Sequence, residues 1–368
     1  MKKRLLIFHP TIAPYRIDFF NDLYSAFDTR VCLQYWNLRD QTFDYEKIYA
    51  QFAFKPHYLK EIVKFGQRSL WGGFWKHLDE FDPDIVLVSE FNVTALMVLA
   101  HRFFKRKKYK VVSICDDSYN MVAENNDFSR LHRMARRLVV PRLDNLILVE
   151  PKVTQWYQEH YNKGICFPII KPEEKARKEY ERVLPISKET FKQYGLKGKK
   201  VFLFVGRLVA LKNVETIIRA FARLNQEENI FAVVGDGPER ENLETLAKDL
   251  KANVIFTGRL EGEALNMWYN IADTFVLASY QEPFGAVTNE ALLAGCYALV
   301  SNKAGSACLV EEGVNGYTFS PMNVEELAQK MEKISALLSV KEEIVFKENM
   351  MQISYSHYMN SLIETING

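Results

Sequence analysis

Two glutamates, Glu282 and Glu290, lie eight residues apart in the stretch EPFGAVTNE. Between them a Pro-Phe-Gly turn leads into the apolar run AVTNEALLAG, which we expect to form a helix. The start of a helix favours anions, because its free N–H groups and the positive end of its dipole point outward. We expect one carboxylate before this turn and the other in the second helical turn. The latter, Glu290, is well suited to accept hydrogen bonds from two adjacent hydroxyls, such as those of a ribose.

A second set of polar residues follows earlier apolar runs. Arg207 and Lys212 occur in GRLVALKN, directly after the run 201–206. Together they offer a forked donor and a point charge, which suit a diphosphate, although each alone could be a solvated loop charge. Gly235 and Gly237 of GDGP permit a tight turn with or without a ligand. The third glycine of a dinucleotide-binding fingerprint is missing.

The elements that position these residues are short apolar runs alternating with amphipathic stretches. Each run is rich in Val, Ile or Phe without strict alternation, as fits strands buried on both faces. The expected strands are 4–8, 30–36, 84–89, 110–115, 145–150, 201–206, 230–235, 253–258, 274–279, 297–301 and 316–320. Repeated strand–helix units indicate parallel sheets, so we predict an α/β fold with two doubly wound, Rossmann-like domains. Ligands of such sheets bind beyond the carboxyl ends of the strands.

Length and composition fit this organisation. A chain of 368 residues exceeds what one hydrophobic core usually serves, so two domains are expected. The segment 168–198 is charged and proline-containing, which places the division near 170. We therefore predict domains at 1–170 and 171–349, with a helical tail at 350–368.

Charge and cysteine content exclude several classes of protein. The net charge of +2 gives no case for nucleic acid as a partner. The five cysteines are scattered without metal-ligand spacing, which favours reduced thiols in a cytoplasmic protein. The N-terminal run LLIF is too short for a signal peptide, and no apolar run is long enough to span a membrane.

Five motifs together resemble one family. GRLVALKN, GDGPE, FTGRL, EPFGAVTNEALLAG and EEGVNGYTF occur in order over about residues 200–320. The set is similar to the C-terminal half of family 4 retaining glycosyltransferases of the GT-B fold, in which two Rossmann-like domains face each other across a cleft. Glu282 and Glu290 match the family's E-x7-E pattern. The first half of the chain matches only in its strand–helix layout.

The resemblance implies roles for individual residues. Arg207 and Lys212 would hold the donor's diphosphate, Glu282 the transferred sugar and Glu290 the ribose. Arg259 and Leu260 would lie against the base, and the backbone of 284–287 would approach the phosphates. The implied nucleotide-sugar site comprises Gly206, Arg207, Lys212, Gly237, Arg259, Leu260, Glu282, Phe284, Gly285, Ala286, Val287 and Glu290. Arg207, Lys212 and Glu282 are the implied catalytic residues.

The implied reaction moves a sugar, with retained configuration, from a nucleotide diphosphate sugar to a glycan, lipid-linked or other hydroxyl acceptor. The setting would be assembly of cell-surface polysaccharide or glycolipid. UDP is the favoured nucleotide, and GDP is possible. The leaving phosphate would take the acceptor's proton, so neither glutamate need be a nucleophile. No cofactor or metal is expected, since Arg207, Lys212 and the helix start supply the positive charge.

The first domain should provide the acceptor side. Tyr15 and Arg16 lie in the first strand–helix loop, and Asp116 and Asp117 follow the run 110–115. Arg16 could bind a phosphate or carboxylate of the acceptor or make only backbone contacts. His9, at a strand end, could line the cleft, although its position favours a structural histidine.

Two basic stretches, 101–110 and 130–142, fall in the same domain. In 130–142, we expect an apolar stripe packed on the sheet and a basic face in solvent. The alternative is contact with an anionic membrane, and hence peripheral attachment at its inner face.

Other functions remain open at this level. A GT-B sugar-nucleotide epimerase would share the architecture but act without an acceptor. A non-catalytic nucleotide-sugar-binding module would keep Glu290 and lose Arg207 or Lys212. An NAD-dependent dehydrogenase would need the full glycine fingerprint. Acceptor-dependent turnover, binding without turnover and NAD-dependent absorbance would distinguish these classes.

Overall fold

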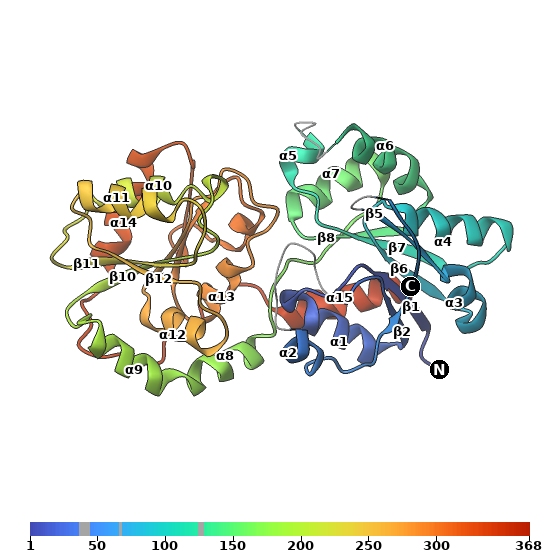
Figure 1. The fold of residues 1–368 in the computed structure, drawn as a ribbon, viewed down its shortest axis with the longest axis horizontal. Coiled ribbons are helices and arrows are strands. Elements are labelled where there is room, and N and C mark those ends of the chain that lie inside the picture. The colour runs from blue at the N-terminus through green and yellow to red at the C-terminus, as the bar shows by residue number, and fades with distance from the viewer. Residues whose placement is uncertain (37–44, 66–67, 124–128) are drawn as a thin grey trace. The chain divides into compact units, whose positions relative to one another are not determined.

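The computed structural model describes residues 1–36, 45–65, 68–123 and 129–368. The chain divides into two compact units. The first comprises Met1–Ile169 together with Ser356–Gly368, and the second comprises Ile170–Tyr355. Both are α/β layers with helices on the two faces of a parallel sheet (Figure 1).

The first unit is built on a seven-stranded sheet in the order β3-β2-β1-β6-β7-β8-β9. Its strands are β1 Arg4–His9, β2 Asp28–Leu33, β3 His57–Tyr58, β6 Ile85–Ser89, β7 Lys110–Cys115, β8 Asn145–Leu148 and β9 Ile165–Cys166. The direction of strand addition reverses between β1 and β6, which pair in parallel. A separate antiparallel hairpin, β4 Lys60–Phe65 and β5 Arg68–Gly72, was not expected from the sequence.

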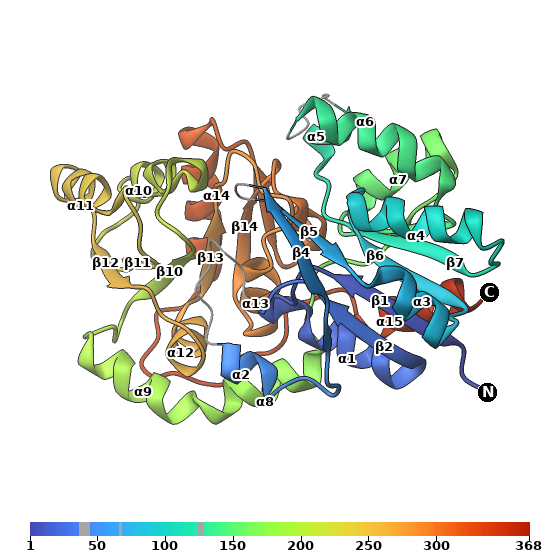
Figure 2. The ribbon, with the colours of Figure 1, turned by 45° about the vertical axis from the view of Figure 1, so that its right-hand side comes forward.

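Helices enclose this sheet. They are α1 Ile17–Ala26, α2 Tyr45–Tyr49, α3 Phe74–Phe81, α4 Val93–Phe104, α5 Tyr119–Ala123, α6 Arg130–Val139, α7 Pro151–Tyr161 and α15 Tyr355–Asn367. The unit also has two 3-10 turns: η1 Pro14–Arg16 precedes α1, and η2 Val140–Arg142 follows α6. α1 and α15 lie on one face, while α4 and α7 lie on the other (Figures 1 and 2). The terminal helix is held in this unit by the Lys3 ammonium, which donates to the Asn367 carbonyl.

The second unit has a six-stranded parallel sheet in the order β12-β11-β10-β13-β14-β15. Its strands are β10 Lys200–Val205, β11 Asn229–Val234, β12 Val254–Gly258, β13 Thr274–Leu277, β14 Tyr297–Ser301 and β15 Gly316–Phe319. Numbered within the unit, this is the 3-2-1-4-5-6 order of doubly wound nucleotide-binding folds. The order reverses between β10 and β13, which pair in parallel.

The helices of the second unit cover both faces of its sheet (Figure 2). They are α8 Glu173–Arg182, α9 Leu184–Gln193, α10 Val214–Phe221, α11 Arg240–Asp249, α12 Glu263–Ile271, α13 Val287–Leu293 and α14 Val324–Leu337. Short 3-10 turns form η3 Ala210–Lys212 and η4 Gly305–Leu309. All six residues of β10 and of β11 are buried. These apolar strands hold the loops at their carboxyl ends in fixed positions.

Candidate functional site

The predicted diphosphate residues lie where the sheet of the second unit reverses. Arg207 and Lys212 follow β10, and Glu282 follows β13, which is its neighbour. Two backbone bonds fix the loop after β10: Leu208 N–H donates to Asp236 O (2.9 Å), and Tyr280 N–H donates to Leu211 O (3.0 Å). This edge is the part of a doubly wound sheet that binds ligands.

Hydrogen bonds from Asn213 fix the end of this loop. It adopts the left-handed conformation, with φ 53°, directly after Lys212. Its buried amide donates to the carbonyls of Ala278 (3.2 Å) and Pro321 (2.8 Å). Because Ala278 follows β13, the lysine-bearing loop is held against the strand end that carries Glu282.

Lys212 and Glu282 form an ion pair between Nζ and Oε2. Both side chains are largely buried, with 20% and 15% of their surface exposed. Arg207 is exposed, and its guanidinium has no ion pair or hydrogen bond to any described residue. The structure thus places these three predicted residues at one edge of the sheet. The Arg207 guanidinium there is exposed and has no partner among the described residues.

The loop between Glu282 and α13 is held by paired backbone bonds. Gly305 N–H donates to Glu282 O (3.0 Å), and Ser306 N–H donates to Phe284 O (2.7 Å). Gly285 has φ +92°, and a Cβ there would lie 2.8 Å from Leu277 Cδ2, so only glycine fits.

The predicted anion-facing amides, those of 284–287, include this glycine. Across the described residues, the N–H groups of Gly285, Ala286 and Val287 have no hydrogen-bond partner. The structure therefore leaves these predicted backbone donors available.

Glu290 lies in a different setting from the one expected. α13 begins at Val287, so Glu290 is in its first turn and not its second. Its carboxylate pairs with Lys171 Nζ (2.6 Å) and accepts from the Tyr269 hydroxyl (2.9 Å). Sequence reasoning missed both partners, because they lie 119 and 21 residues away in the chain. The two glutamates are thus each held by a different lysine.

The remaining predicted residues of the second unit lie around this edge. Gly206 directly follows β10, and its N–H donates to Val234 O (3.0 Å), while Gly237 lies in the loop after β11. Arg259 and the half-buried Leu260 follow β12, the outer strand of the sheet. Arg259 is exposed and pairs with Glu261. Its position against a base stays a prediction.

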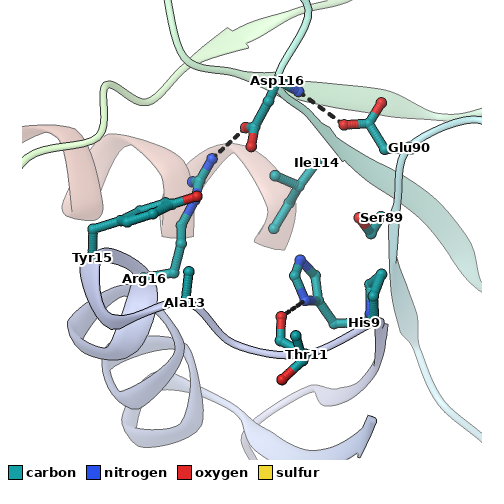
Figure 3. Close-up of a pocket in the computed structure, with 10 residues that line it drawn as sticks. His9, Thr11, Ala13, Tyr15, Arg16, Ser89, Glu90, Ile114 and Asp116 are labelled. Carbon is teal, nitrogen blue, oxygen red and sulfur yellow. Dashed lines mark hydrogen bonds and ion pairs between the residues drawn. The ribbon is translucent and has the colours of Figure 1, made fainter. Parts of the chain in front are cut away.

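In the first unit, Tyr15, Arg16 and Asp116 line one cavity of about 160 Å³ (Figure 3). Arg16 is buried and pairs with Asp116 through Nη2 (2.6 Å). His9, which the sequence offered as a residue that could line the cleft, and Glu90, which it did not single out, line the same cavity. It lies where the sheet order reverses between β1 and β6.

Asp117 is not part of this cavity. It is 1% exposed and accepts from Tyr157 Oη (2.5 Å), His132 Nε2 (3.1 Å) and Arg136 Nη1 (3.3 Å). Burial raises the pKa of this carboxyl, but its hydrogen bonds outweigh that effect and leave the pKa below its usual value. Asp117 therefore anchors α6 and α7 and cannot face an acceptor.

The same contacts correct the expectation for the basic helix. Arg136, predicted to be on a solvated face, is buried beside Asp117. The apolar side chains Leu131, Met134 and Leu138 are instead exposed, at 64%, 58% and 55%. The helix exposes these three apolar side chains but buries Val139 together with Arg136, which the Asp117 carboxylate draws inward.

Glu90, Cys115 and Asp117 have potential ligand atoms within 4.8 Å of one another, the one such group of three in the described residues. The Cys115 thiol donates to Glu90 Oε2 (3.3 Å). Burial raises the pKa of Glu90 to about 7 and that of Cys115 well above its usual value. Metal ligation needs the deprotonated forms of these groups. The contacts within the cluster account for its arrangement, and we propose no metal ion there.

Comparison with known proteins finds a family match within the second unit. Residues 186–348 match the family described as glycosyl transferases group 1. This match covers most of the second unit and none of the first. It confirms the resemblance drawn from the motifs.

Two sequence relatives are similar to part of the chain. One is an uncharacterized glycosyltransferase of Methanocaldococcus jannaschii, 34% identical over 46% of this chain and 44% of that protein. The other is an alpha-D-kanosaminyltransferase of Streptomyces kanamyceticus, 31% identical over 40% and 39%. Each match spans less than half of the relative.

Solved structures extend the likeness to the whole chain. HepE from Anabaena, solved in complex with UDP, superposes with a TM-score of 0.76 over 99% of both chains at 17% identity. At this identity the likeness concerns the fold. The predicted GT-B fold, with two doubly wound sheets, is confirmed.

Proposed function

We propose that this protein is a retaining glycosyltransferase whose group 1 domain binds a nucleotide diphosphate sugar at the β10–β13 edge. The observation that carries the proposal is the convergence of Arg207, Lys212 and Glu282 on that edge, beside free backbone donors. UDP is the favoured nucleotide, supported by the UDP that HepE binds. GDP remains the other candidate.

The charge arrangement supports a dissociative transfer. Breaking the bond between sugar and phosphate leaves positive charge on the sugar and negative charge on the diphosphate. Arg207 and Lys212 would stabilise the leaving group more in the transition state than in the ground state. Glu282, adjacent to Lys212, would bind the hydroxyls of the sugar. The departing phosphate would take the acceptor's proton, and no step needs a metal ion.

The acceptor is proposed to bind the first unit, at the cavity lined by Tyr15, Arg16 and Asp116. Its location at the reversal point of the first sheet supports this assignment. Asp117 is buried beneath α6, so we do not assign it to the acceptor side.

We further propose that α6 attaches the protein peripherally to an anionic membrane surface. Its exposed Leu131, Met134 and Leu138 share one face, and Arg130 and Arg137 are exposed beside them. An apolar stripe flanked by arginines is the pattern of interfacial helices. Among the described residues, no helix is both long and apolar enough to cross a membrane. Assembly of cell-surface polysaccharide or glycolipid is the setting that such attachment favours.

Binding to anionic vesicles is expected to weaken about thirtyfold when Arg130 and Arg137 are both replaced by alanine, since each basic residue contributes about 1 kcal/mol. Replacing Leu131, Met134 and Leu138 by serine should abolish binding even at low salt. Co-sedimentation measures both, with Leu337→Ser as the control, because Leu337 is 62% exposed on α14 of the other unit. Equal sedimentation of the triple serine variant and the wild type would refute the attachment through α6.

A further inference from the structure

The cavity of the first unit contains polar groups whose hydrogen-bonding capacity is unused. It has a volume of about 160 Å³, room for several waters and hence for a ring-sized molecule. His9 ends β1 and Glu90 follows β6, so the two sides of the cavity come from the strands that flank the reversal point. Figure 3 shows the His9 ring directed toward the middle of this space.

His9 presents a hydrogen-bond acceptor to the cavity. Its Nδ1 lies 2.6 Å from Thr11 O, and because a carbonyl only accepts, Nδ1 carries the proton. Nε2 is then the unprotonated nitrogen, and it has no hydrogen-bond partner among the described residues. Burial lowers the pKa of His9 to about 4, with a further contribution from Arg16, so the ring is neutral at pH 7.

Arg16 presents a donor to the same cavity. Its side chain is 5% exposed, and Nη2 is occupied by Asp116. Nη1 is buried and has no hydrogen-bond partner in the structure. A buried donor without a partner is costly, which points to a ligand atom that it satisfies when bound.

The charges around the cavity disfavour an anionic ligand. Asp116 neutralises Arg16, and the Glu90 carboxyl lies behind it, accepting from Asp116 N–H (3.1 Å). Burial and the neighbouring aspartates raise the pKa of Glu90 to about 7. Glu90 holds this place although its φ of 59° is uncommon for a residue other than glycine. A phosphate or carboxylate in the cavity would therefore meet two carboxyl groups and one guanidinium that is already paired.

We propose that this cavity is a subsite for an uncharged, hydroxylated ring of the acceptor, with His9 Nε2 accepting from one hydroxyl and Arg16 Nη1 donating to another oxygen. A hydroxyl both donates and accepts, so a sugar ring matches this pair, whereas a phosphate matches only the arginine. The inference rests on the proposed function and gives its acceptor a chemical class. It replaces the expectation that Arg16 binds an acceptor phosphate or carboxylate.

The test is ligand-observed NMR on the full chain at pH 7 with saturating UDP. The neutral probes are the methyl α-glycosides of glucose, galactose and mannose, and the anionic probes are glucuronate and glucose 6-phosphate. At least one neutral glycoside is expected to bind, and each anionic probe is expected to bind at least tenfold more weakly. In protein carrying ¹⁵N-histidine, the Nε2 resonance of His9 should shift as the neutral glycoside binds.

His9→Phe keeps a flat ring beside Phe20 but removes both nitrogens. Loss of one hydrogen bond should weaken the glycoside about tenfold or more, while UDP affinity stays unchanged. The control is His160→Phe, which changes an exposed histidine on α7 outside the cavity. The ¹⁵N measurement on the wild type tests the contact independently of how this variant folds.

The outcomes separate the two proposals. If UDP binds but no neutral glycoside does, or if an anionic probe binds more tightly, the subsite inference is wrong and the proposed function stands. Unaltered glycoside affinity in His9→Phe would also contradict the inference. Failure of the wild type to bind UDP, GDP and ADP alike would contradict the proposed function on which the inference rests.

Discussion

Replacing Arg207 by alanine is expected to lower turnover of the nucleotide sugar about a hundredfold or more, which corresponds to about 2.7 kcal/mol of transition-state stabilisation. The reason is that its guanidinium is held at the β10–β13 edge without a protein partner in the described residues. It is therefore available to a leaving diphosphate. Release of nucleoside diphosphate from the donor measures the effect.

Lys212→Ala should lower turnover similarly, although the variant also frees Glu282 from its ion pair. If the two cations act as a unit, the double variant should lose less than the product of the single losses. Arg223→Ala is the matched control, since Arg223 is an exposed arginine of the same unit that pairs with Glu325. Near-wild-type turnover in either single variant would mean that the phosphates bind elsewhere.

Exchanging each glutamate for glutamine is expected to produce two different defects. Glu290 is held in the first turn of α13 by Lys171 and Tyr269, in a position to accept from ribose hydroxyls. Such bonds form equally in the ground and transition states. Glu290→Gln should therefore weaken binding of the nucleoside diphosphate about tenfold, since hydrogen bonds to charged groups contribute about 1.5–3 kcal/mol.

Glu282→Gln should lower kcat at least tenfold while leaving nucleoside diphosphate affinity nearly unchanged. Its carboxylate would bind the sugar, and those bonds strengthen as positive charge develops on the ring. The variant also releases Lys212, so any change in diphosphate affinity should be toward tighter binding.

Titration of both variants with the nucleoside diphosphate, followed by turnover, decides between the roles. Tyr280→Phe provides a control, because this exposed tyrosine lies two residues before Glu282. Loss of diphosphate binding in Glu282→Gln but not in Glu290→Gln would reverse the assignment. A glycosyl adduct trapped on either glutamate would show that it acts as a nucleophile, which the account does not expect.

The strands were the part of the fold that the sequence predicted best. The run 110–115 is β7, and 297–301 is β14, with the same bounds. A strand that is buried on both faces appears in the sequence as a continuous apolar run. Such a run can be recognised without knowing which strands it pairs with. The β4–β5 hairpin was missed because its residues, such as Lys60 and Glu61, lack such a run.

The sequence predicted only those site residues that belong to recognisable motifs. Arg207, Lys212 and Glu282 lie together because they follow neighbouring strands. Lys171 was missed as the partner of Glu290, since no local pattern links residues so distant in the chain. Asp117 was assigned to the acceptor side from its strand-end position, but its three buried donors turn it inward. Arg136 of α6 is thereby drawn inward and Leu131, Met134 and Leu138 are exposed, whereas the apolar stripe alone predicted that these three side chains pack on the sheet.

We propose that the second unit binds a nucleoside diphosphate through Arg207 and Lys212. Calorimetric titration of UDP into the wild type and into the Arg207→Ala/Lys212→Ala variant tests it most directly. We predict saturable binding with one UDP per chain in the wild type and no measurable binding in the double variant. Equal affinity in the two proteins, or failure of the wild type to bind UDP, GDP and ADP alike, would contradict it.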